Sequence, residues 1–191
     1  MCARLRRSNI DGAEGAIDEL TRIVGQIRQA WPEVKIIIRA DSGFCRDDLM
    51  SWCEDEKNRI GYVLGLAKNE RLKKEITDEM KQAEALFGQT QRPARVFRDF
   101  RYQTLKSWSR ERRVIGKAEW MDKGANPRFV VTSLSPESMD ARAIYEDFYC
   151  ARGDMENRIK EQQLDMFADR TSAATMRANQ LRLYCPRPLI S

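Results

Sequence analysis

The stretch K-I-I-I-R-A-D-S-G-F, residues 35–44, contains the pattern that decides the fold of this chain. Three consecutive isoleucines are typical of a β-strand that is buried on both faces. The run ends at Asp41, which is followed by a serine and a glycine. Such a strand can hold a carboxylate rigidly at the edge of a sheet, but an ordinary strand end has the same pattern. The flanking sequence has to distinguish these two interpretations.

The segments around this strand alternate between strand and helix patterns. Residues 2–7 resemble the end of a strand, and residues 8–32 have apolar side chains at helical spacing up to Pro32. Residues 46–57 predict a second helix, with acids in its first turn. Residues 61–67 predict another short apolar strand. Strands that alternate with helices indicate a parallel α/β sheet.

The second half of the chain changes in character. A charged helix is predicted over residues 70–87, and antiparallel strands follow where aromatic and β-branched residues lie between turn signals. Asp140 then introduces a helix predicted over residues 141–167. We therefore divide the chain into the first part of an α/β core (1–88), a β-rich insertion (89–135), C-terminal core helices (136–185) and an irregular tail (186–191).

Composition restricts the chemistry available to the chain. It has 191 residues, of which 42% are hydrophobic and 33% charged, as is typical of a globular protein. No apolar run approaches the roughly 18 residues of a membrane helix, so we expect no membrane partner. Five cysteines without C-x-x-C spacing predict a reducing, cytoplasmic location. The absence of histidine excludes Ser-His and Cys-His nucleophiles, which leaves carboxylates, lysines, tyrosines and a hard metal ion.

Basic residues gather around Trp108, although the net charge of the chain is only +5. The cluster suits phosphate contacts, because arginine presents a planar fork of donors. In that interpretation Trp108 stacks on a DNA base. A solvated charged face is the alternative for the cluster, and for Trp108 we favour a place in the core. The candidate phosphate contacts are Arg110, Arg112, Arg113 and Lys117.

The helix predicted over residues 141–167 carries two stripes. Its polar stripe alone predicts no more than a surface ladder of ion pairs, and the neighbouring apolar stripe predicts contact with the core. The polar stripe comprises Tyr149, Arg152, Glu156, Lys160 and Gln163, and the apolar stripe comprises Ile144, Phe148, Met155 and Ile159.

Taken together, these motifs resemble the DDE transposases of bacterial insertion sequences, in the group called transposase DDE domain group 1. The resemblance extends from about Ala3 to Leu183. It is specific because several long motifs occur in order. They are IRADSGF (38–44), WCE (52–54), YVLGLAKN (62–69), WSRERRVIGKAEW (108–120), NPRFVVTSL (126–134) and YCARGDMENRIKEQQLDMFADRTS (149–172).

The resemblance implies an RNase H-like core in which three carboxylates bind two divalent metal ions, Mg²⁺ or Mn²⁺. Asp41 matches the second carboxylate of the family and Glu156 matches the third. Hard cations prefer carboxylate oxygens, which agrees with a chain that has no histidine. Such a site would cleave and transfer DNA strands at transposon ends and target DNA.

The resemblance also implies contacts to the DNA backbone. Tyr149 and Arg152 match the Tyr-x-x-Arg-x-x-x-Glu signature that ends at the third carboxylate. Relatives carry a lysine seven residues after that glutamate, where this chain has Gln163. Lys160, one helical turn after the glutamate, is the candidate replacement.

The first carboxylate of the family has no counterpart in this sequence. It belongs to a strand upstream of residues 2–9, and Asp11 and Asp18 fall in a turn and a helix. We therefore expect a partial catalytic core that is inactive alone and that can associate with itself or with a full-length transposase. An RNase H-like nuclease would use the same acids, but the β-rich insertion favours a transposase. The alternative from another class is a non-catalytic DNA-binding or transposase-regulating module.

Overall fold

The structure is a computed structural model that describes residues 11, 13–152, 175 and 178. One of its two compact units is Gly15–Tyr149, and the fold described below is that of this unit. None of the helices in the described ranges has both the length and the apolar character needed to cross a bilayer.

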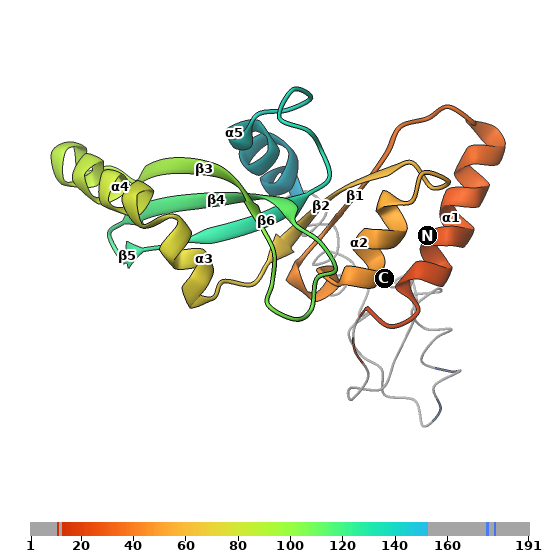
Figure 1. Cartoon of the computed structure of the whole chain (residues 1–191). Coiled ribbons are helices and arrows are strands. Elements are labelled where there is room, and N and C mark those ends of the chain that lie inside the picture. The colour runs from red at the N-terminus through yellow and green to blue at the C-terminus, as the bar shows by residue number, and fades with distance from the viewer. Residues whose placement is uncertain (1–10, 12, 153–174, 176–177, 179–191) are drawn as a thin grey trace. The chain divides into compact units, whose positions relative to one another are not determined.

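The described residues form one mixed sheet with helices on both faces (Figure 1). Strands β1 and β2 are parallel, as predicted, and the other pairs are antiparallel. The order across the sheet is β1 (Ile36–Ala40), β2 (Ile60–Leu66), β6 (Arg128–Thr132), β4 (Arg112–Met121) and β3 (Ala94–Tyr102), and β5 (Gly124–Ala125) pairs with β4.

The predicted β-rich segment extends the sheet that β1 and β2 begin. β3 and β4 pair over nine positions, from Ala94 opposite Trp120 to Tyr102 opposite Arg112. β6 then pairs with both β4 and β2, so that it joins the antiparallel strands to the parallel pair. The antiparallel character predicted for this segment is confirmed, whereas its division from the α/β part stays a prediction.

Alternating side chains of the central strands fill two apolar cores. On β2, Tyr62 and Leu64 belong to the core shared with the first helices, and Val63 belongs to the core on the opposite face. On β4, Val114 and Ile115 divide in the same way. Burial on both faces explains the nearly continuous apolar run of β2. The five residues of β1 are only half-buried, contrary to the expected full burial, because β1 lies at the edge of the described sheet.

The first two helices occupy the predicted positions. Helix α1 (Ala16–Ala30) begins after Gly15, which has a φ of 69°, and ends before Trp31 and Pro32. Helix α2 (Asp47–Glu54) forms the crossover between β1 and β2 and packs against β2. Cys53 of α2 is buried and its pKa is raised by burial to about 12, so it packs as a small apolar residue.

The charged helix predicted over residues 70–87 is divided at Ile76. α3 (Glu70–Glu75) and α4 (Thr77–Thr90) flank this residue, whose side chain is fully buried. A Cβ on Gly116 of β4 would lie 2.6 Å from Cγ2 of Ile76, so the glycine lets this side chain pack directly on the sheet. The break therefore coincides with a tertiary contact, in which one apolar side chain packs into the sheet.

The helix introduced by Asp140 changes type along its length. The Asp140 carboxylate accepts a hydrogen bond from the Ala143 backbone N–H at 3.0 Å and caps α5 (Ala141–Ala143). A π-helix, η2 (Ile144–Tyr149), and a 3₁₀ turn, η3 (Cys150–Arg152), continue it. The predicted helix is thus helical up to Arg152, and the rest of its span lies outside the described residues. Ile144 and Phe148 contact the core as predicted.

Candidate functional site

Asp41 lies at the end of β1, where the chain leaves the sheet. One carboxylate oxygen, Oδ1, accepts a hydrogen bond from the Gly43 backbone N–H at 2.9 Å, and this bond caps the 3₁₀ turn η1 (Ser42–Phe44). A Cβ on Gly43 would lie 3.0 Å from the same oxygen, which is tighter than ordinary contact. The turn therefore fixes one oxygen of an exposed carboxylate, as the sequence of residues 35–44 predicts.

Tyr149 of η2 reaches the same strand end through Gly65 of β2. A Cβ on Gly65 would lie 2.5 Å from the Tyr149 hydroxyl oxygen, 3.0 Å from the Ser42 backbone nitrogen and 3.2 Å from the Asp41 carbonyl carbon. The hydroxyl thus occupies the space that a larger residue would fill. Gly65 brings Tyr149 and Asp41 together, although 108 positions separate the two in the sequence.

A pocket of about 470 Å³ surrounds these groups, and we call it the Asp41 pocket. It carries two exposed cations, Lys68 after β2 and Arg128 at the start of β6, and neither has an ion-pair partner within the described part of the chain. One acid, two cations and two tyrosines suit a phosphate ester with an attached ring better than an apolar ligand. The lining comprises Asp41, Ser42, Gly65, Leu66, Ala67, Lys68, Pro127, Arg128, Phe129, Tyr145 and Tyr149.

The aromatic wall of the Asp41 pocket is supported from behind. The ring centroids of Tyr145 and Tyr149 lie 5.8 Å apart. Lys117 Nζ of β4 lies 5.3 Å from the Tyr145 ring centroid and donates a 2.6 Å hydrogen bond to the buried carboxylate of Glu119. Burial raises the pKa of Glu119, but the hydrogen bonds from Lys117 and Arg95 outweigh it, so its pKa lies below the usual value. Lys117 and Glu119 therefore both stay charged beneath the aromatic wall.

The structure brings together two of the predicted site residues, Asp41 and Tyr149. The backbone of Arg152 lies in η3, whereas Glu156 and Lys160 lie outside the described residues. The meeting of Asp41 and Glu156 in one metal site therefore stays a prediction.

Asp41 supplies a ligand of the right chemistry for a divalent cation. A carboxylate oxygen is the donor that Mg²⁺ and Mn²⁺ prefer. Within residues 11, 13–152, 175 and 178, no cluster of three or more acidic, cysteine or histidine side chains could hold a metal ion. The described pocket thus provides one carboxylate of the predicted pair, and Glu156 would have to provide the other.

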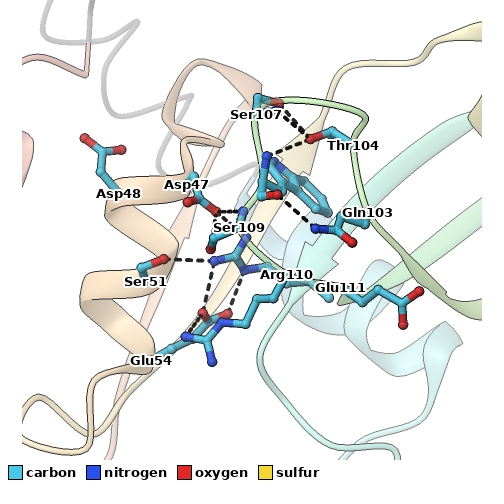
Figure 2. Close-up of polar contacts among 12 residues, drawn as sticks. Asp47, Asp48, Ser51, Glu54, Gln103, Thr104, Ser107, Ser109, Arg110 and Glu111 are labelled. Carbon is cyan, nitrogen blue, oxygen red and sulfur yellow. Dashed lines mark hydrogen bonds and ion pairs between the residues drawn. The ribbon is translucent and has the colours of Figure 1, made fainter.

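The basic cluster around Trp108 is mostly internal, which corrects the predicted phosphate surface. Figure 2 shows Asp47, Ser51 and Glu54 of α2 turned toward this cluster. Arg112 is 2% exposed, and its guanidinium donates to Asp47 at 2.6 Å and to Glu54 at 2.8 Å. A third hydrogen bond, to Ser51, completes the link between β4 and α2. Because these acceptors occupy the guanidinium, Arg112 cannot meet a phosphate in this conformation. We call Asp47, Ser51, Glu54, Trp108 and Arg112 the Arg112 cluster.

Two further members of the predicted phosphate surface are also buried. Arg113 donates to Asp99 at 2.5 Å and to the Leu134 carbonyl at 2.8 Å, and Lys117 is held by its ion pair beneath Tyr145. Only Arg110 of the four candidates is exposed, with 56% of its side chain accessible, and it pairs with Glu54 at 2.7 Å. The number of basic residues in the sequence thus did not reveal that most of these four bind carboxylates and carbonyls inside the protein.

Trp108 belongs to the core, as favoured over a stacking platform. It is buried and lies edge-on to Tyr102, with 5.9 Å between the ring centroids. The guanidinium carbon of Arg112 lies 5.6 Å from the Trp108 ring centroid. The Thr104 hydroxyl accepts hydrogen bonds from the backbone N–H groups of Ser107 and Trp108 (Figure 2). These contacts fix the loop between β3 and β4 without exposing the indole.

Sequence reasoning missed Lys68, Arg128, Tyr145 and Gly65. Lys68 follows the end of one strand, and Arg128 is the first residue of another. Proximity to strand ends is therefore the signal that could have identified them. No spacing in the sequence indicates that β6 lies beside β2, and this pairing is what brings Arg128 to the pocket.

Comparisons with known proteins agree with the resemblance seen in the motifs. The sequence model of the family described as transposase DDE domain group 1 matches residues 1–186, nearly the whole chain. No curated protein and no solved structure gave a significant match. The mixed α/β sheet is compatible with a DDE-type domain. On the extent of this match, the chain belongs to the transposase DDE domain group 1 family.

Proposed function

We propose that this chain acts on DNA phosphodiesters as the catalytic part of an insertion-sequence transposase, through the Asp41 pocket. The observation that carries the proposal is the meeting of Asp41 with Tyr149, Lys68 and Arg128 in one pocket of about 470 Å³. An RNase H-like core is part of the proposal, and membership of the family supports it.

Each residue of the proposed site has a role that follows from its chemistry. Asp41 and Glu156 would hold Mg²⁺ or Mn²⁺, which when bound activates a water or a 3′-hydroxyl and stabilises the leaving oxygen on phosphorus. Lys68 and Arg128 would bind the phosphates next to the reacting one, since both are exposed cations at the pocket wall. Tyr149, Arg152 and Lys160 would position the DNA backbone.

The first experiment measures metal-dependent cleavage and strand transfer on transposon-end DNA. The chain alone is expected to be inactive, so both reactions are measured with and without a full-length transposase of the same element. Asp41→Asn and Glu156→Gln are each expected to abolish the cleavage and strand transfer that the wild-type chain adds, because each variant removes a charged metal ligand. Asparagine keeps an oxygen for the Gly43 N–H, so Asp41→Asn should fold normally. Asp78→Asn is the matched control, since Asp78 is an exposed helix carboxylate paired only at the surface with Lys81.

The possible outcomes separate the proposal from its alternatives. Cleavage that requires both acids supports the transposase, and hydrolysis without strand transfer supports a nuclease. DNA binding without cleavage, unchanged in the Asp41→Asn and Glu156→Gln double variant, would favour a non-catalytic module. Adding a full-length transposase of the same element would then show whether the chain associates with it and inhibits it.

A further inference from the structure

Arg39 connects the strand that ends at Asp41 to the helix that carries Tyr149. Its Nη1 donates a hydrogen bond to the Phe148 backbone carbonyl at 2.5 Å, and its guanidinium carbon lies 5.9 Å from the Phe148 ring centroid. Arg39 is two residues before Asp41, and Phe148 is one residue before Tyr149. A single side chain therefore bridges the backbones of both pocket-forming segments.

The carbonyl that Arg39 reaches lies within the π-helical turn Ile144–Tyr149. Single π-helical turns are uncommon and frequently occur at functional sites. The Arg39 guanidinium is a charged donor to this carbonyl, and a charged donor makes a stronger bond than a neutral one.

The π-helical register determines where Tyr149 points. Tyr145 and Tyr149 both line the Asp41 pocket, and the Tyr149 hydroxyl fits against Gly65. In an α-helix, each one-residue change of register rotates the following side chains by about 100°. A change from π to α bonding would therefore turn Tyr149 away from Gly65 and from the end of β1.

We propose that Arg39 is a positioning residue: its bond to the Phe148 carbonyl holds the π-helical turn and thereby keeps Tyr149 in the Asp41 pocket. That this arrangement serves DNA chemistry rests on the proposed function, whereas the positioning itself does not. Arg39 acts through Tyr149, so its loss is expected to change the place of that ring before it changes any reaction.

The test observes Tyr149 directly, without requiring activity. The full chain is prepared with 3-fluorotyrosine, and the ¹⁹F resonance of residue 149 is assigned by a Tyr149→Phe variant. Arg39→Met is expected to shift or split this resonance and to accelerate hydrogen exchange of the amides in residues 145–152. Arg39→Lys, which keeps the charge and a donor, should restore most of the original resonance.

Arg98 provides a matched control. It also donates to a helix carbonyl, that of Glu75, and lies 5.8 Å from an aromatic ring centroid, that of Phe100. Arg98→Met removes the same kinds of contact away from the pocket, together with ion pairs to Glu75 and Glu79, so residue 149 should keep its resonance. An unchanged resonance in Arg39→Met, or an equal change in Arg98→Met, would overturn the proposal. Should Arg39→Met fail to fold, Arg39→Gln, which keeps a neutral donor, is compared in the same way.

A second readout keeps this proposal separate from the proposed function. Binding of a short transposon-end duplex is measured for the wild type, Arg39→Met and Tyr149→Phe. If Arg39→Met moves the ¹⁹F resonance while no variant affects DNA binding or cleavage, the positioning role stands and the proposed function fails. Loss of activity with an unmoved resonance would support the proposed function and overturn the positioning role.

Discussion

The Asp41 pocket and the Arg112 cluster use the same residue types in opposite ways. In the cluster, the Arg112 guanidinium bonds to two carboxylates and a serine, and only 2% of the residue is exposed. In the pocket, Lys68 and Arg128 are exposed and have no ion-pair partner in the described ranges. The difference teaches that a basic residue is available to a ligand only where the fold leaves its donors unoccupied.

Removing the central cation of the Arg112 cluster should have the largest effect on stability. Arg112→Met leaves the carboxylates of Asp47 and Glu54 without their shared partner, which typically costs about 3–5 kcal/mol of unfolding free energy. Urea denaturation measures the loss. Arg110→Met is the control, because Arg110 pairs with the same Glu54 from the surface and should cost no more than about 1 kcal/mol. Equal losses in both variants would contradict the structural role of the buried Arg112.

A methyl group at Gly65 tests the packing of the Asp41 pocket. Gly65→Ala places a Cβ against the Tyr149 hydroxyl and the backbone of residues 41 and 42, and overpacking of this kind costs about 1–3 kcal/mol. Thermal unfolding measures the stability, and the ¹⁹F resonance of residue 149 reports the displaced ring. Gly25→Ala is the control. Among the described residues, no atom outside its own stretch of helix lies within 4 Å of its Cβ position, so it should stabilise helix α1 by about 0.5–1 kcal/mol.

The exposed cations of the Asp41 pocket should contribute to DNA affinity and not to stability. Lys68→Ala and Arg128→Ala are each expected to reduce the slope of log affinity against log salt by about 1, because each removes one phosphate contact. Fluorescence anisotropy over a salt series measures the slope. Lys81→Ala, at an exposed surface pair on α4, is the control. A slope that stays constant in both pocket variants would show that the pocket does not meet phosphate.

The smallest expected effect is a difference in acid stability. Burial raises the pKa values of Asp47 and Glu54, but hydrogen bonds outweigh it and lower the two pKa values below their usual 3.8 and 4.5. Asp47 accepts these bonds from Ser109 and Arg112, and Glu54 accepts them from Arg112 and Tyr62. Groups with a lowered pKa stabilise the fold above these usual values, and this contribution is lost as pH falls through the folded-state pKa. Circular dichroism from pH 6 to pH 2 should therefore show a steeper loss in the wild type than in Arg112→Met.

Local sequence patterns predicted the elements on which the site is built. The isoleucine run and its Asp-Ser-Gly ending indicated β1 and the turn that holds Asp41, and Asp140 indicated the start of the helix that leads to Tyr149. These features depend on contacts between near neighbours, such as the 2.9 Å bond from the Gly43 N–H to Asp41. A sequence displays such contacts because the partners are two or three positions apart.

Other features depend on partners that are distant in the sequence. The break at Ile76 coincides with packing beside Gly116, and the burial of Arg112 follows from carboxylates 58 and 65 positions away. Neither the basic cluster around Trp108 nor the charged helix over residues 70–87 contains a local signal of these contacts. The predicted phosphate surface around Trp108 was therefore wrong for Arg112, Arg113 and Lys117, whereas the predicted helix is present and only its break at Ile76 was missed.

The sequence by itself determined the order of strands and helices, the acid at the end of β1 and, through its motifs, membership of the transposase DDE domain group 1 family. Only the tertiary structure decided which cations remain free and which residues share the pocket with Asp41. The physical reason is that β6 pairs with β2, and η2 packs on the sheet, through contacts made across the fold. Those contacts bring Arg128 and Tyr149 to Asp41, and they also enclose Arg112 among acids.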